Sequence, residues 1–142
     1  MNIIIDSNIL FSALIKNSAT RSIILDYNGF FLFPEYIFVE MEKHKEFILD
    51  KSKMNDQDFK KLLELILKKV VIVSNEVLIA HKAEAIKIVE NIDINDVTFV
   101  ACALAYNNSV IWSDDKKLKK ISKVKVINTK EFIEYLSQYY IN

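Results

Sequence analysis

The sequence predicts a single doubly wound α/β domain, in which helices cover both faces of a parallel sheet. Short runs rich in Ile, Val and Phe alternate along the chain with longer stretches of helical period. The runs at residues 3–5, 30–33 and 70–73 are continuously apolar, as expected of strands that are buried on both faces. The length of 142 residues suits one domain spanning 1–142, and no repeat, linker or low-complexity segment divides it.

The predicted strands each end at a polar residue or at proline. They are residues 2–5, 30–33, 70–73, 110–113 and 124–127. The predicted helices are residues 9–15, 21–27, 35–51, 76–90 and 96–106, one that Asn55 caps and that runs to Leu67, and one that Thr129 opens. Parallel strands joined by right-handed crossovers bring their carboxyl ends to one edge of the sheet. Several aromatic residues and the thiol are predicted to lie in the core: Phe30, Phe31, Phe33, Phe99, Trp112 and Cys102.

Composition excludes several classes of function. One Gly and one Pro leave no Gly-rich phosphate loop of the Walker or dinucleotide-binding kind. A single cysteine can form neither an internal disulfide nor a zinc site of several thiolates, which suits a reducing cytoplasm. We expect no signal peptide and no membrane span. The 19 basic and 19 acidic residues balance, which argues weakly against a nucleic-acid binder unless the charges are segregated.

Acidic residues follow strands or begin helices at corresponding places along the chain. Asp6 directly follows the first strand, and Asp114-Asp115 directly follow the fourth. Asp96 begins a strongly apolar helix, and Glu40 lies in the helix after the second strand. Each acid alone also fits a helix cap, a turn or a salt bridge. Ligands of open α/β sheets bind beyond the carboxyl ends of the strands, so these acids are predicted to converge there.

A cluster of carboxylates predicts phosphoryl chemistry. Crowded carboxylates repel one another, and their pKa values rise unless a cation neutralises them. Hard oxygen ligands suit Mg²⁺ or Mn²⁺, which bind through a few carboxylates together with substrate phosphate. Such ions activate water and stabilise a leaving oxygen in phosphodiester cleavage.

Four sequence blocks carry a resemblance to a known family. They are residues 3–10 (IIIDSNIL), 39–42 (VEME), 93–104 (DINDVTFVACAL) and 111–118 (IWSDDKKL). In this order and spacing the chain resembles, over essentially its full length, the PIN domain nucleases, including toxin subunits of the VapC type. Ser7 stands where threonine is more usual in the first block.

The resemblance implies a five-strand sheet in the order 3-2-1-4-5 and cleavage of RNA that depends on Mg²⁺ or Mn²⁺. It implies that Asp6, Glu40, Asp96 and Asp115 form the catalytic metal-binding pocket, with the three aspartates as metal ligands. It favours a homodimer and leaves open whether a cognate antitoxin is a partner.

Supporting roles are predicted for residues beside the acids. Asn8 and Ser113 would orient ligands or water by hydrogen bonds. Asp93 is either a helix cap, which we favour, or an outer-sphere ligand, and Asp114 adjoins the final acid. His44, one helical turn beyond Glu40, is more simply a structural residue than a functional one.

A basic run follows the last acid of the cluster. We predict that its first members contact RNA: Lys116, Lys117, Lys119 and Lys120. The placement suits sequence-independent attraction to a phosphate backbone, although a solvated charged surface explains the run equally well.

Two other functions fit parts of the pattern. A haloacid-dehalogenase-type phosphatase also places Asp after its first strand but needs a second Asp two residues later, where this chain has Asn8. A response-receiver domain would need paired acids near the first strand, which are missing. A non-catalytic RNA-binding module of the same fold would have lost cluster acids, and all four positions are acidic here.

Overall fold

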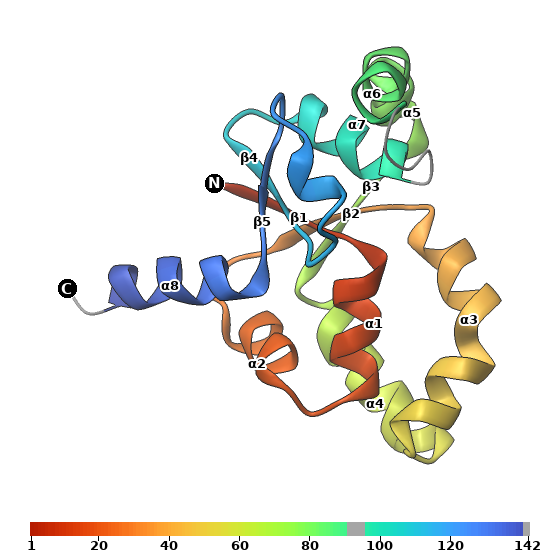
Figure 1. Ribbon diagram of the computed structural model, residues 1–142. Coiled ribbons are helices and arrows are strands. Elements are labelled where there is room, and N and C mark those ends of the chain that lie inside the picture. The colour runs from red at the N-terminus through yellow and green to blue at the C-terminus, as the bar shows by residue number, and fades with distance from the viewer. Residues whose placement is uncertain (91–95, 141–142) are drawn as a thin grey trace.

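A five-stranded sheet lies at the centre of the protein, described by a computed structural model over residues 1–90 and 96–140 (Figure 1). Its strands are β1 Asn2–Ile5, β2 Phe31–Pro34, β3 Val70–Val73, β4 Ser109–Trp112 and β5 Lys125–Ile127. The helices are α1 Ser7–Ile15, α2 Ala19–Asp26, α3 Ile37–Ser52, α4 Asp56–Leu67, α5 Asn75–Ile79, α6 Lys82–Val89, α7 Val97–Ala105, the 3₁₀ helix η2 Leu118–Lys120 and α8 Thr129–Tyr140.

All neighbouring strands of the sheet are parallel, and their order is β3-β2-β1-β4-β5. The chain moves from β1 to the β3 edge and then crosses to β4 and β5, so the direction of winding reverses between β1 and β4. This reversal is the switch point at which open α/β sheets bind ligands. The predicted fold class and the strand order that the resemblance implied are both confirmed.

Helices cover the two faces of the sheet. On one face α7 packs against β1, β2 and β4, and α5 and α6 pack against α7. On the other face α1, α2 and α4 pack together (Figure 1). This division follows from right-handed crossovers, because connections that run in opposite directions across the sheet place their helices on opposite faces. None of the described helices is both long and apolar enough to cross a bilayer.

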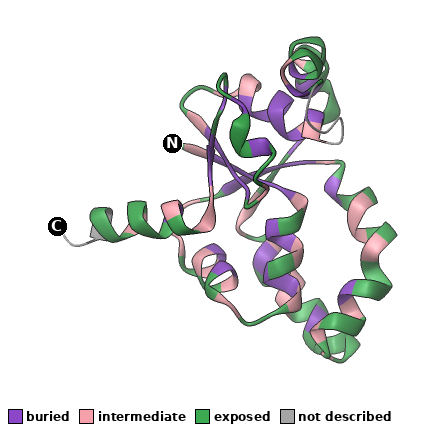
Figure 2. Cartoon of the chain, in the orientation of Figure 1, coloured by how far each residue is buried: buried purple, intermediate pink, exposed green. Residues whose placement is uncertain are grey.

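The core is continuous through the strands and the inner sides of the helices, as the buried residues in Figure 2 show. The central strand residues Ile3, Ile4 and Ile5 are fully buried. Cys102 is also fully buried, and burial raises the pKa of its thiol to about 12. The thiol is therefore a packing group, as predicted.

Two predictions about individual elements were wrong. Residues 76–90 form two helices, α5 and α6, rather than one. A straight helix of that length would extend about 22 Å, whereas α7 extends only about 14 Å, and the break lets both halves contact α7. Phe30 was expected in the core but is 64% exposed, because β2 begins one residue later, where Phe31 pairs with Ile3 and Val70.

Candidate active site

The carboxyl ends of β1 and β4 form the floor of a cleft of about 310 Å³. Ile5 is in register with Trp112, and the N–H of Asp6 donates to the carbonyl of Trp112 at 3.3 Å. Asp6 and Ser113, the residues that follow these two strands, therefore leave the sheet side by side. The cleft is lined by Asp6, Ser7, Asn8, Tyr36, Glu40, Lys43, His44, Asp96, Phe99 and Asp115.

Asp6 combines a structural contact with a buried charge. Its Oδ1 accepts a hydrogen bond from the backbone N–H of Ile9 at 2.9 Å, which caps the N-terminus of α1. The residue is only 5% exposed. Burial raises the pKa of Asp6 above its ordinary value of 3.8; hydrogen bonds from Ser113 and Ile9 oppose the rise, and the carboxylates of Asp114 and Asp115 add to it. The anion of Asp6 is thus disfavoured by its surroundings, and a bound cation would relieve that cost.

Ser113 lies behind the cleft and connects two of its acids. The residue is 1% exposed, and its Oγ accepts a hydrogen bond from the N–H of Asp115 at 3.1 Å. The same hydroxyl is hydrogen bonded to the carboxylate of Asp6. Asp115 itself accepts a hydrogen bond at Oδ1 from the N–H of Lys117 at 2.8 Å. The serine after β4 therefore fixes the spacing between the ends of β1 and β4.

Glu40 lies in the first turn of α3 and has two side-chain neighbours in the cleft. The Nε2 of His44 is 3.4 Å from Oε2 of Glu40, one helical turn away. The hydroxyl of Tyr36 is hydrogen bonded to Glu40, and this bond, followed by the negative charge of Glu40, raises the pKa of Tyr36. The ring of Phe11 packs edge-on against His44 at 5.6 Å between centroids. Glu40 is therefore held from both sides along α3.

Asp96 enters the cleft from the start of α7. Its Oδ2 is buried, and the residue directly precedes the apolar helix that packs on the sheet. Phe99, one turn later, forms an apolar wall of the cleft and packs edge-on against Phe33. Asp93, predicted as a cap or an outer ligand, lies outside the described residues.

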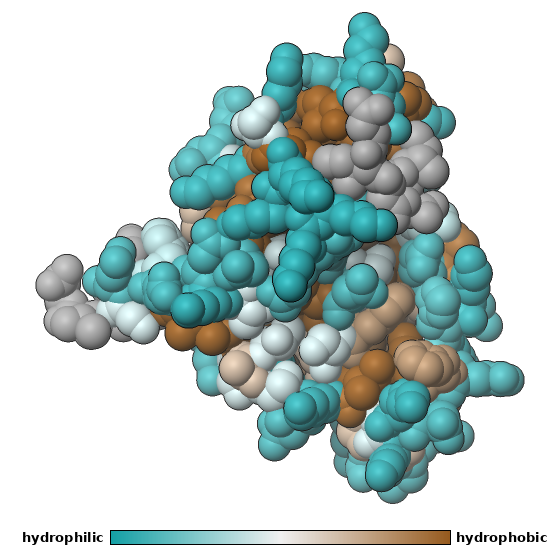
Figure 3. All heavy atoms as spheres, in the orientation of Figure 1, coloured by the Kyte–Doolittle hydropathy of each residue, from teal (hydrophilic) through white to brown (hydrophobic). Residues whose placement is uncertain are grey.

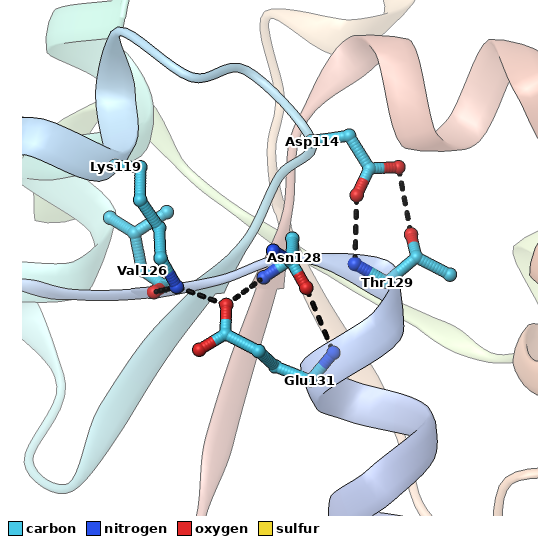
Figure 4. Close-up of polar contacts among 6 residues, drawn as sticks. All are labelled: Asp114, Lys119, Val126, Asn128, Thr129 and Glu131. Carbon is cyan, nitrogen blue, oxygen red and sulfur yellow. Dashed lines mark hydrogen bonds and ion pairs between the residues drawn. The ribbon is translucent and has the colours of Figure 1, made fainter.

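Asp114 and Lys119 turn away from the cleft, toward β5 and α8 (Figure 4). The two carboxylate oxygens of Asp114 accept hydrogen bonds from the N–H and the hydroxyl of Thr129, at 2.7 and 2.8 Å. Lys119 forms an ion pair with Glu131 and donates to the carbonyl of Val126 at 3.0 Å. Asp114 therefore contacts the start of α8, and Lys119 contacts both α8 and β5.

The other three lysines that were predicted to contact RNA divide between two places. Lys116 and Lys117 are exposed in the turn after Asp115. Lys120 lines a separate groove against α6. The four lysines that were predicted to act together thus face three different parts of the surface.

Sequence reasoning did not single out Tyr36 or Lys43, although both line the cleft. Tyr36 comes two residues after the end of β2, at the same edge of the sheet as Asp6, and Lys43 lies one turn after Glu40. Applying the strand-end rule to β2 and the helical repeat to Lys43 would have found them. Lys43 adds a cation to a cleft whose other charged groups are acidic.

The oxygen donors of the cleft suit a hard divalent cation. Among the described residues, no three Asp, Glu, His or Cys side chains surround one point closely enough to hold an ion together. Mg²⁺ needs no such closed set, since it keeps several waters and binds proteins through one or two carboxylates with substrate phosphate. The open row of carboxylates and the raised pKa of Asp6 fit that mode of binding.

Comparison with known families agrees with this geometry. A sequence model of the PIN domain matches residues 4–137. The chain belongs to the PIN domain family. PIN domain proteins are nucleases that generally use divalent metal ions. The family resemblance of the four sequence blocks is thereby confirmed.

Solved structures include PIN domains of similar fold. One is a chain in the crystal structure of VapBC2 from Rickettsia felis bound to a DNA fragment from their promoter, with a TM-score of 0.66 and 18% sequence identity. The match covers 90% of this chain and 98% of that chain, and at this identity it shows the shared fold alone. No curated protein matches the sequence.

Proposed function

We propose that this PIN domain is an endoribonuclease that depends on Mg²⁺ or Mn²⁺. One observation carries the proposal: Asp6, Glu40, Asp96 and Asp115, from four separate segments of the chain, line a single cleft. A cleft that gathers negative charge at the switch point of the sheet suits a cation and the phosphate that a cation attracts. The balanced net charge of the chain is compatible with this proposal, because four of its 19 acidic residues line the cleft, where a bound cation would offset their charge.

We assign Asp6, Asp96 and Asp115 as the residues that hold the ion. The bound ion would supply an activated water and stabilise charge on the phosphate oxygens. We assign Glu40 to accept a proton at a carboxylate oxygen, with Tyr36 and His44 fixing its orientation. These roles rest on the contacts above and on the family chemistry.

The residues around the acids complete the proposed mechanism. Asn8 lines the cleft and would orient water or a ligand through its amide. Ser113 would hold Asp6 and Asp115 at their spacing. Lys43 brings a positive charge to the side of the cleft formed by α3, where it would contact a non-bridging phosphate oxygen.

We further propose that the protein is the toxin of a toxin–antitoxin pair and that it forms a homodimer in the cytoplasm. Support for the antitoxin comes from the fold shared with the Rickettsia felis structure, which is a VapBC complex. Co-expression with the product of an adjacent small gene, followed by co-purification, tests the antitoxin, and light scattering of the purified chain tests the dimer.

The decisive experiment is cleavage of a structured RNA pool with Mg²⁺ or Mn²⁺ and with EDTA. Asp6→Asn and Asp115→Asn should abolish metal-dependent cleavage. Asp50→Asn, at an exposed acid near the end of α3, is the matched control and should cleave like the wild type. Cleavage that survives both cleft substitutions would refute the assignment of the site.

The alternative is a non-catalytic RNA-binding module with the PIN fold. Titration calorimetry with Mn²⁺ distinguishes the two functions, because an inert module would bind no metal in the cleft. Metal binding that Asp6→Asn removes supports the nuclease, whereas RNA binding without metal binding supports the module. The phosphatase alternative is set aside, since the chain belongs to a nuclease family.

A further inference from the structure

A second groove, of about 400 Å³, separates α6 from the segment that joins η2 to β5. We call it the lysine groove, and its charged residues are Lys87 and Glu84 from α6, Lys120 at the end of η2, and Lys123 from the joining segment. Three ammonium groups against one carboxylate leave two positive charges in excess. The chain as a whole carries no net charge, so this groove is a local concentration of positive charge.

The lysines of this groove are available to a ligand. Lys87, Lys120 and Lys123 are all exposed. Within residues 1–90 and 96–140, ion pairs join only His44 to Glu40 and Lys119 to Glu131, so none of the three groove lysines is paired with a carboxylate. Like charges that lie near one another without a partner are complemented by an anion.

The groove is shaped for an extended anion rather than for a small one. Its floor includes Ile121, which is 8% exposed, and Ile88, while the charges stand on its rims. None of the charged residues described in this groove is buried, so none is placed to fix a single phosphate. In Figure 3 hydrophilic side chains cover the η2 region at the centre of the face, beside an apolar hollow toward α6. Flexible ammonium groups on open rims suit a chain of phosphates.

The lysine groove lies close to the acid cleft along the chain. Lys120 follows Asp115 by five residues, so their Cα atoms are no more than about 18 Å apart. Among the residues that the structure describes, the cleft is lined by four acids and one lysine, so it repels the nucleotides on either side of a bound phosphate. Binding of a polyanion therefore needs positive charge outside the cleft, within a short length of backbone.

We propose that the lysine groove binds the phosphate backbone of single-stranded RNA next to the nucleotide held in the acid cleft. The proposal rests on the proposed function in one respect, the choice of RNA as the ligand. It adds Lys87, which lies outside the basic run, and Lys123, a later member of that run, to the predicted lysines. It also separates Lys120 from Lys119, whose ammonium group is paired with Glu131.

The test measures RNA affinity in EDTA, where binding is read without cleavage. Fluorescence anisotropy of a labelled single-stranded RNA, long enough to reach from cleft to groove, is recorded between about 50 and 200 mM salt. The test variant is Lys87→Gln/Lys120→Gln/Lys123→Gln. The matched control, Lys60→Gln/Lys61→Gln/Lys68→Gln, removes the same charge from exposed lysines of α4 and its C-terminal cap, at the other end of the molecule (Figure 1).

We expect the groove variant to lose about 2 from the slope of log affinity against log salt, since each phosphate contact contributes roughly 0.7 for single strands. Its affinity at about 50 mM salt should fall on the order of a hundredfold. The control should keep the wild-type slope. Equal losses in both variants, no loss in the groove variant, or no RNA binding by the wild type would overturn the proposal.

The outcome is separable from that of the nuclease proposal. If the protein binds RNA through these lysines but never cleaves it, the lysine-groove proposal stands and the nuclease proposal is refuted. If the protein cleaves RNA and the groove variant keeps the wild-type salt slope, the nuclease proposal stands and the lysine-groove proposal is refuted. Circular dichroism melting of each variant checks the fold, and the single substitutions Lys87→Glu and Lys123→Glu repeat the test if the triple variant melts early.

Discussion

Substitution of Asp6 by Asn should stabilise the protein at neutral pH in the presence of EDTA. The Asp6 side chain is 5% exposed, and burial raises the pKa of its carboxyl. Asn keeps an oxygen that can accept the hydrogen bond from Ile9, and Asn and Asp rank equally as helix N-caps. The substitution therefore removes a disfavoured charge and leaves the cap of α1 intact.

The sign of the pH dependence follows from the raised pKa. The folded protein holds the Asp6 proton more tightly than the unfolded chain, so this group contributes stability below the ordinary pKa of 3.8. That contribution is lost as the pH rises through the higher pKa of the folded state. The gap in unfolding free energy between Asp6→Asn and the wild type should thus open from acid to neutral pH, by about 1.4 kcal/mol for each unit of pKa difference that titration measures.

The Asp6→Ala substitution measures how much the N-cap hydrogen bond of Asp6 stabilises the protein. Alanine also removes the charge, but it leaves the N–H of Ile9 without its 2.9 Å acceptor. Loss of an N-cap costs about 1 kcal/mol, within a range of roughly 0.5–2. Asp6→Ala should therefore be less stable than Asp6→Asn by that amount, or by about 2–4 °C in Tm for a domain of this size.

Urea denaturation at acid and neutral pH measures both differences. Adding Mn²⁺ should raise the stability of the wild type and leave both variants unchanged, since a ligand that binds only the folded state stabilises it. An Asp6→Asn variant that is less stable than the wild type in EDTA at neutral pH would refute the reasoning about the buried charge. Equal stability of the Asn and Ala variants would refute the role of the cap.

Two further predictions concern the attachment of α8. Phe132→Ala should lower the free energy of unfolding by about 3–5 kcal/mol in urea denaturation, because this fully buried ring packs against Phe31 and Trp112. Lys130→Ala, at an exposed site, is the control and should change the stability little. A loss for Phe132→Ala as small as that of the control would contradict the packing. Thr129→Val should cost about 1–3 kcal/mol, because the hydroxyl accepts from the indole N–H of Trp112 at 2.9 Å and donates to Asp114 at 2.8 Å. Thr129→Ser keeps the hydroxyl, and equal stability of the Val and Ser variants would show that the network contributes nothing.

The sequence by itself determined the fold class and the positions of the four cleft acids along the chain. Continuous apolar runs such as residues 2–5 form strands only when both faces are covered, and alternation with helices forces parallel pairing. Right-handed crossovers then leave few arrangements of the sheet. Asp6 and Asp115 follow strands that the order 3-2-1-4-5, implied by the family resemblance, makes neighbours. Their approach was therefore predicted from the resemblance together with the order of the elements, and β1 does pair with β4.

The tertiary structure alone decided which polar side chains face the cleft. Asp114 and Asp115 are adjacent in sequence, yet one contacts Thr129 on α8 and the other lines the cleft, because successive side chains after a strand point in different directions. Lys119 and Lys120 are also adjacent but lie in different surroundings. Lys119 pairs with Glu131, whereas Lys120 lines the groove beside α6. Such choices depend on partners that are distant along the chain, and no local pattern records them. Tyr36 and Lys43 differ from these residues, because the end of β2 and the helical repeat of α3 do indicate their places in the cleft.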